Sequence, residues 1–295
     1  NDPLVRFSCA EALTYLGDTA GVGELAKAVE KQPYFRAFAL TAMASLDESI
    51  CHTKLRDLLW SEGDDETRYG AFRALKALDE RDPALTGKRI NNAFWLHHVA
   101  PQTKKPFVHL SLGTQAEIVM FGEIPKLNPP FALSAGEHVV TAGEDDQRCT
   151  VSYFPRDGRG VSRRRCSLDL ASIINTMATH GASYEEIVNL VQQADRVKTM
   201  SCRVRKDALP QATSVYELAQ AGKLRKRLQE NPNDKQAREM LADLEIIKPD
   251  EEHSITPTLF EQQRGRGSAI AHRQAQQELL RKKKSGKEKE TAFLE

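Results

Sequence analysis

The stretch LDLASIINTMATHGASYEEIVNLVQQADRV, residues 168–197, carries the clearest helical periodicity in the chain. Apolar residues recur at positions i, i+3, i+4 and i+7 on both sides of Gly181, which predicts two amphipathic helices. Gly181 stands where a helix C-cap is expected, and Ser183 with Glu186 forms a capping box that begins the second helix. The predicted apolar stripes are Leu170, Ile173, Ile174 and Met177, then Ile187, Leu190, Val191 and Ala194.

Strands are predicted on both sides of this helix pair. Alternation of apolar and polar residues begins at Pro106 and indicates a half-buried strand. Further strands are expected over residues 116–122, 137–143, 149–154, 161–167 and 200–210, of which 149–154 and 161–167 form a hairpin. The sequence therefore predicts a β/α unit over 106–212. We expect a linker at 84–105, where Trp95, His97 and His98 lie in a short helix or loop.

The first 83 residues contain an internal repeat. VRFSCAEALTYLGD (5–18), FRAFALTAMASLDE (35–48) and TRYGAFRALKALDE (67–80) align at spacings of 30 and 32 residues. Shorter amphipathic stretches separate the three units, so we predict helix pairs stacked into an α-solenoid over 1–83. The pattern resembles HEAT repeats in their short bacterial form, which implies a protein-binding scaffold. The resemblance rests on Asp2, Pro3, Val5, Arg6, Ala10, Ala12 and Leu13.

Two groups of arginines are candidate partner-binding residues. Arg6, Arg36 and Arg68 occupy the same position in the three repeats. They form either a ladder of cations on a binding face or, as we favour, structural contacts with neighbouring acids. The second group lies in the predicted hairpin and either binds an anionic partner or, as we favour, keeps a charged edge from aggregating. Its candidates are Arg159, Arg163 and Arg164, within a patch that also holds Arg156 and Arg165.

The remaining segments are less specific. Residues 213–249 are predicted to form a helical hairpin, and 250–295 read as a disordered tail because apolar residues are few. Since residue 1 is Asn and falls inside a repeat, we expect a fragment that lacks its N-terminus and any export signal. The chain has five cysteines, of which Cys149 and Cys166 flank the hairpin. These two could pair in an oxidising compartment, although small buried apolar residues are the favoured interpretation.

Composition and motifs limit the possible functions. Lys and Arg number 42 against 41 Asp and Glu, so a globally basic nucleic-acid binder is excluded and no nucleic-acid partner is expected. No apolar run long enough for a transmembrane helix is present. Phosphate-loop, zinc-protease and nucleophile-elbow motifs are missing, so we expect no cofactor, no metal and no enzymatic activity. The alternative is an enzyme whose site uses His98, His109 or His138.

The segment from residue 168 to residue 204 resembles the C-terminal part of the bacterial flagellar basal-body P-ring protein. The resemblance covers about 40 residues and pairs two helices with a following strand, with Tyr184 in place of the family's proline. The matching residues are Leu170, Ile174, Gly181, Ala182, Ser183, Glu186, Ile187, Val188, Val191, Gln192 and Ala194.

This resemblance implies a structural protein of α+β class without catalytic residues. P-ring subunits surround the flagellar rod in the periplasm, so it implies partners that include other copies of the chain, the rod and peptidoglycan. The helices and strands would then be surfaces on which subunits pack, and loss of the protein would abolish motility. The alternative is a HEAT-repeat scaffold that binds another protein and has no flagellar role.

Overall fold

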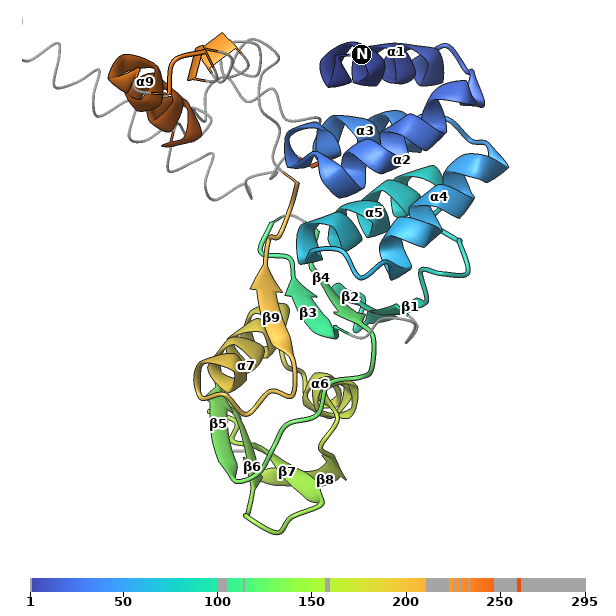
Figure 1. Cartoon of the computed structure of the whole chain (residues 1–295). Helices are drawn as coiled ribbons and strands as arrows, with labels where there is room; N and C mark the ends of the chain where they lie inside the picture. The colour runs from blue at the N-terminus through green and yellow to red at the C-terminus, as the bar shows by residue number, and fades with distance from the viewer. Residues whose placement is uncertain are drawn as a thin grey trace, which may run out of the picture.

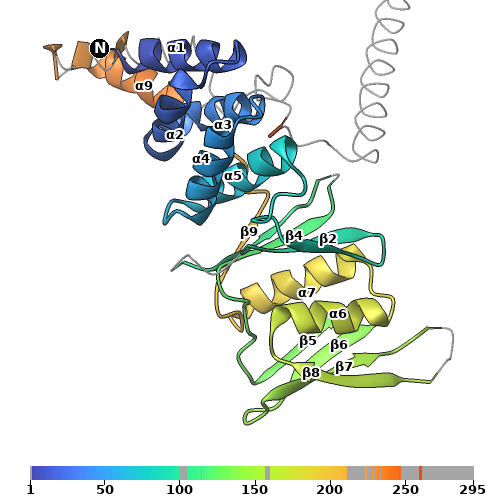
Figure 2. The same cartoon turned by 90° about the vertical axis from the view of Figure 1, so that its right-hand side faces the viewer.

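A computed structural model describes most of the first 210 residues and short stretches beyond them. Four layers follow one another in space: a group of five helices, a five-stranded sheet, a pair of helices and a four-stranded sheet (Figures 1 and 2). The described residues are 2–99, 105–113, 115–156, 160–210, 223–224, 227–228, 230–232, 234–246 and 259–260.

The helix pair predicted from the sequence is confirmed and forms the third layer. Helix α6 (Leu170–Thr179) and helix α7 (Tyr184–Arg196) lie on either side of Gly181, whose φ of 86° suits a residue without a side chain. The Ser183 hydroxyl accepts the Glu186 backbone N–H while the Glu186 carboxylate accepts the Ser183 N–H, which completes the capping box. Both apolar stripes are buried in a core shared with the two sheets.

The five-stranded sheet covers one side of this helix pair. Its order is β1-β2-β4-β3-β9, in which β2 runs parallel to β4 and β3 runs parallel to β9. The expected linker at 84–105 instead contributes two strands of this sheet, because Phe94 and Leu96 are buried in the core shared with α6 and α7. The strands are β1 (Gly87–Ile90), β2 (Phe94–Val99), β3 (Phe107–Leu110), β4 (Glu117–Phe121) and β9 (Arg203–Lys206).

The four-stranded sheet covers the other side of the helix pair. It is an antiparallel meander of order β5-β6-β7-β8, in which β7 and β8 form the predicted hairpin. Its first strand, β5, has no counterpart among the predicted strands. The strands are β5 (Phe131–Ala135), β6 (His138–Ala142), β7 (Arg148–Tyr153) and β8 (Ser162–Ser167).

The predicted α-solenoid is wrong. The N-terminal helices do not form an open array, because α5 lies on the five-stranded sheet and their core continues into Phe107, Val119 and Phe121 of that sheet. The group of helices covers a sheet, and the whole is a mixed α+β structure. The helices are α1 (Pro3–Tyr15), α2 (Val22–Lys31), α3 (Arg36–Ala44), α4 (Ser49–Trp60) and α5 (Asp65–Leu78).

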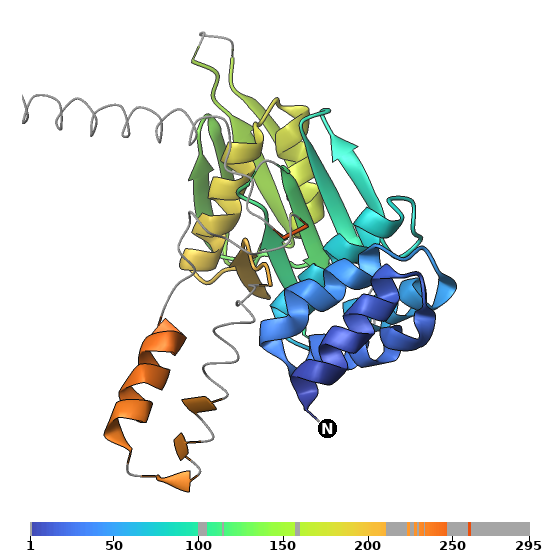
Figure 3. The same ribbon diagram turned by 90° about the horizontal axis from the view of Figure 1, so that it is seen from above.

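The C-terminal predictions fall largely outside the described residues. Within the predicted helical hairpin, helix α9 (Lys235–Ile246) is described and lies to one side of the helical layer (Figure 3). Of the predicted tail at 250–295, only residues 259 and 260 are described, and Phe260 is buried against the N-terminal core.

Glu117 joins three of the four layers through its buried carboxylate and its backbone carbonyl. The Glu117 side chain, on β4, is 1% exposed and accepts hydrogen bonds from the Tyr69 hydroxyl at 2.8 Å and the Lys76 ammonium at 2.7 Å, both on α5. On the other face of the sheet, the Tyr184 hydroxyl of α7 lies 2.9 Å from the Glu117 carbonyl oxygen and 2.6 Å from that of Ser111. Since a buried charge is costly unless paired, the carboxylate holds α5 to β4, while the hydrogen bonds of Tyr184 to backbone carbonyl oxygens hold α7 to the same strand.

We expect Glu117→Gln to lower the free energy of unfolding by about 3 kcal/mol, because Lys76 would lose its charged partner in a buried site. Urea denaturation followed by circular dichroism measures this loss. The control is Glu123→Gln at an exposed position near the end of β4, which should change the value by less than about 0.5 kcal/mol. If Glu117→Gln and Glu123→Gln lowered the free energy of unfolding equally, the Glu117–Lys76 ion pair would not be a main stabilising contact.

Acid should destabilise the fold through His109. This side chain is buried against Tyr69, with ring centroids 3.4 Å apart, and burial followed by the Arg73 charge lowers its pKa to about 3. The unfolded chain binds a proton near pH 6.5, so the stability from neutral His109 is present above that pH and falls as the pH drops towards 3.

Between pH 7 and pH 4.5 we therefore expect wild type to lose roughly 2 kcal/mol more stability than His109→Gln, whose side chain does not titrate. Urea titrations of both proteins at the two pH values give the comparison. Parallel losses in the two proteins would assign the acid sensitivity to other groups.

Candidate functional site

One face of the four-stranded sheet lies against α6 and α7, while no described element covers the other face (Figure 2). Because side chains alternate along a strand, the uncovered face carries the residues that alternate with the helix-facing ones, and of these Ser152 is buried among its neighbours. Most of its side chains are small or carry a hydroxyl, and the rest are three arginines. We name this surface the arginine face; it consists of Ala132, Ser134, Val139, Thr141, Arg148, Thr150, Ser152, Arg163, Arg165 and Ser167.

The charges on the arginine face are of one sign. Arg163 and Arg165 lie two residues apart on β8, and strand register places Arg148 diagonally from Arg165. All three side chains are exposed, none of the other residues of the face is acidic, and the structure gives the three no ion pair with a described residue. The carboxylate of Asp169 lies at the end of the face, where it accepts a hydrogen bond from the Ser167 hydroxyl. Three grouped cations that form no ion pair with a described residue favour an anionic partner.

The structure separates the arginines that the sequence grouped together in this hairpin. Arg164 is exposed but shares the helix-facing side of β8 with Cys166, where burial and then the Arg164 charge lower the pKa of His180. Arg159 lies outside the described residues. Arg148 was not among the predicted site residues, although alternation counted back along the first hairpin strand places it on the outward face.

The repeated arginines of the helical layer occupy three different environments. Arg6 is half-exposed, and its Nε lies 3.2 Å from Glu24 on α2. Arg36 is buried, donates to the Val29 carbonyl and pairs with Asp64 at 2.9 Å and Glu66 at 3.3 Å.

Arg68 is fully buried, and its guanidinium donates to the Lys105 carbonyl at 2.6 Å. It also lies 4.8 Å from the Phe107 ring centroid and 5.1 Å from that of Phe121, and burial lowers its pKa to about 10. Arg36 and Arg68 therefore join elements inside the protein and do not form a cationic ladder with Arg6.

A cavity of about 1130 Å³ lies between the start of α5 and strand β9. Ion pairs cross it: Asp65 of α5 lies 3.0 Å from Arg203 and 2.8 Å from Arg205, both on β9. The Arg36 pairs described above line the same cavity. The acidic side chains at the start of α5 are therefore paired with arginines. The ion pairs between Asp65 and the two arginines of β9 hold the helical layer to the edge of the sheet.

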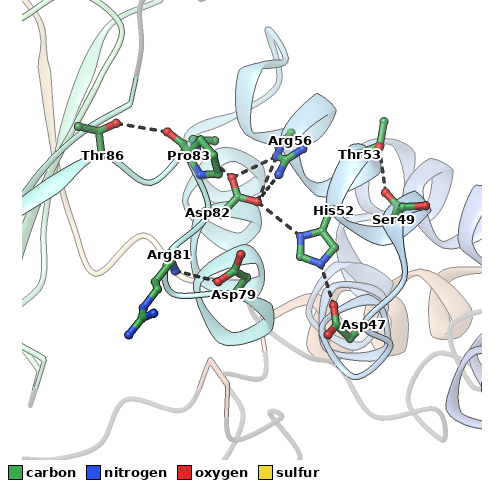
Figure 4. Close-up of polar contacts among 11 residues, drawn as sticks. Asp47, Ser49, His52, Thr53, Arg56, Asp79, Arg81, Asp82, Pro83 and Thr86 are labelled. Atoms are coloured by element: carbon green, nitrogen blue, oxygen red, sulfur yellow. Dashed lines mark hydrogen bonds and ion pairs between the residues drawn. The ribbon is translucent and has the colours of Figure 1, made fainter.

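A histidine and two aspartates lie together where α4 meets the end of α5 (Figure 4). His52, Asp79 and Asp82 each offer one ligand atom within 4.8 Å of the others, which is the spacing a metal ion needs. However, Arg56 already binds both oxygens of the buried Asp82, with the closest contact at 2.6 Å. Because a guanidinium occupies this carboxylate, the group acts as an ion-pair network between α4 and the segment that follows α5.

The pKa values in this network agree with that role. Burial alone would raise the pKa of Asp82, but hydrogen bonds from Arg56, the Ala84 backbone N–H and His52 bring it below its usual value. The hydrogen bond to Asp47, at 2.9 Å, is the main reason that the pKa of His52 is raised.

The three histidines of the enzyme alternative are not brought together. His98, on β2, contacts the Gly122 carbonyl at 2.8 Å, and His109 lies under α5. His138 lies in the other sheet, with its Nδ1 3.4 Å from Glu186 of α7.

Comparison with known proteins finds no matching protein family, no matching curated protein and no matching solved structure. Among the described helices, none combines the length and the apolar character that crossing a membrane requires.

We expect Arg56→Ala to lower the free energy of unfolding by about 2–3 kcal/mol, because it leaves the buried Asp82 carboxylate without its main partner. Thermal denaturation with and without Zn²⁺ measures both the stability that Arg56 contributes and any binding of the metal ion. Wild type should show no rise in Tm with the metal. Arg81→Ala, which removes an exposed side chain nearby, is the matched control and should change stability by less than about 0.5 kcal/mol.

Proposed function

We propose that this chain is a structural, non-enzymatic subunit of a ring-shaped assembly similar to the flagellar P-ring. In this proposal the protein works in the periplasm at the flagellar basal body and contributes to motility. Its partners are further copies of itself together with the rod or peptidoglycan.

The observation that carries this proposal is the position of the segment that resembles the P-ring family. Residues 168–197 form the α6–α7 layer on which both sheets pack, and the matching apolar residues lie in that core. The resemblance therefore concerns residues that determine the fold, which is where a shared structure is expected to leave its strongest sequence signal. The matching residues of the core are Leu170, Ile174, Ala182, Ile187, Val188, Val191 and Ala194.

In such an assembly, we propose that subunits contact one another through the sheets. Helices α6 and α7 are enclosed by a sheet on each side, so they are not the packing surfaces that the resemblance implied. No described element covers the arginine face or pairs with the outer edge of β8, and we assign to them the contact with an acidic surface of a neighbouring component.

The test is motility and localisation in the source organism with a tagged full-length copy. Deletion should abolish swimming, and the wild-type copy should restore it with foci at the flagellar base. A copy carrying Arg163→Glu and Arg165→Glu should be present at normal level but restore at most about a tenth of the swimming rate, because reversed charges repel an acidic partner.

The matched control carries Lys88→Glu and Arg89→Glu, two exposed cations on β1 of the other sheet, and should swim normally. A motile deletion strain would refute the flagellar proposal. Normal swimming of the Arg163/Arg165 variant would refute only the assignment of the arginine face as a contact surface, and would leave the flagellar proposal in place.

A further inference from the structure

Two cysteines face each other across the β7–β8 hairpin. Cys149 and Cys166 are direct partners in the antiparallel register, and their sulfur atoms lie 3.3 Å apart. Both side chains are buried on the helix-facing side of the sheet. All five cysteines lie in the described part of the chain, and this is the one pair whose sulfurs are in contact.

This arrangement meets the geometric needs of a disulfide. Directly opposed residues of an antiparallel pair have Cβ atoms close to the separation that a disulfide spans, so small side-chain rotations bring the sulfurs to bonding distance. The bond would link strands that already pair, without moving a helix or a sheet.

The two thiols also differ in a way that suits oxidation. The hydrogen bond from the Cys149 thiol, which stabilises the thiolate, lowers the pKa of Cys166 and raises that of Cys149. Cys166 is therefore the nucleophile of the pair, since a thiolate and not a thiol attacks a disulfide. Burial raises the pKa of Cys51 and of Cys202 to about 11, so these two are poor nucleophiles at neutral pH.

We propose that Cys149 and Cys166 form a disulfide bond that fastens the edge strand β8 to the sheet when the chain meets a disulfide-bearing oxidant. The Cys166 thiolate attacks one sulfur of the oxidant, which forms a mixed disulfide and releases one thiolate. That thiolate takes the Cys149 proton, and the Cys149 sulfur then attacks Cys166 and releases the second thiolate. The second thiolate takes up the proton that Cys166 had released to water, so two protein thiols are oxidised and one oxidant disulfide is reduced to two thiols.

The oxidant reaches the buried pair when β8, an edge strand, separates from β7, or before the sheet closes. Once formed, the bond restrains the strand that carries Arg163 and Arg165, and so keeps the arginine face in place. This inference concerns the chemistry of the hairpin and does not depend on the flagellar role.

The test uses the purified full chain, treated with oxidised glutathione or with dithiothreitol, then alkylated and digested for mass spectrometry. Oxidation should yield a peptide linked through residues 149 and 166 that has lost two hydrogen atoms, while Cys51 remains alkylatable after unfolding. The oxidised protein should melt roughly 5–10 °C above the reduced one.

Cys166→Ala should abolish this difference in Tm between oxidised and reduced samples, whatever its own stability, while Cys9→Ser at an exposed site should retain it. Free thiols at both positions after oxidation, or linkage of either one to a different cysteine, would overturn the proposal. Alkylation of the protein in intact source cells adds a readout independent of swimming. If the disulfide forms both in swimming cells and in cells whose copy of the protein does not restore swimming, the disulfide is established independently of the flagellar role.

Discussion

The fold depends on how one buried acid is satisfied. Glu117 stands in the second layer, binds Tyr69 and Lys76 of the first layer through its side chain, and receives Tyr184 of the third through its carbonyl oxygen. The carboxylate has no access to water, so α5 must supply its partners, Tyr69 and Lys76. The backbone carbonyl of the same residue separately binds Tyr184 of α7. This constraint explains why the N-terminal helices are part of the same body as the sheets.

Secondary structure could be predicted from the sequence where the residues that determine it lie close together in the chain. The α6–α7 pair could be located because apolar spacing, a glycine and a capping box lie within thirty residues of one another. The strands over 84–105 and β5 escaped because their burial comes from elements distant in the chain, and Trp95 and His97 carry no clear alternation. The repeats predicted helices correctly but not their arrangement, since Tyr69 and Phe72 pack on a sheet that the repeat pattern does not encode.

The arginine face could be predicted only in part, because its composition depends on strand register as well as on local sequence. A run of three arginines is visible in any reading of the sequence, but only strand register shows that Arg163 and Arg165 share a face with Arg148 while Arg164 does not. Conversely, equivalent repeat positions suggested equal roles for Arg6, Arg36 and Arg68. The structure distributes them from half-exposed to fully buried, because each repeat has different neighbours.

The placement of β9 has a consequence for synthesis on the ribosome. This strand follows both helices and the second sheet in the chain, yet it pairs in parallel with β3 at an edge of the first sheet. The first sheet therefore stays incomplete until more than ninety further residues have been translated after β3. Such long-range closure slows folding and leaves Asp65 without its two arginines in the meantime, so the nascent chain passes through a prolonged stage in which a chaperone could engage the open edge.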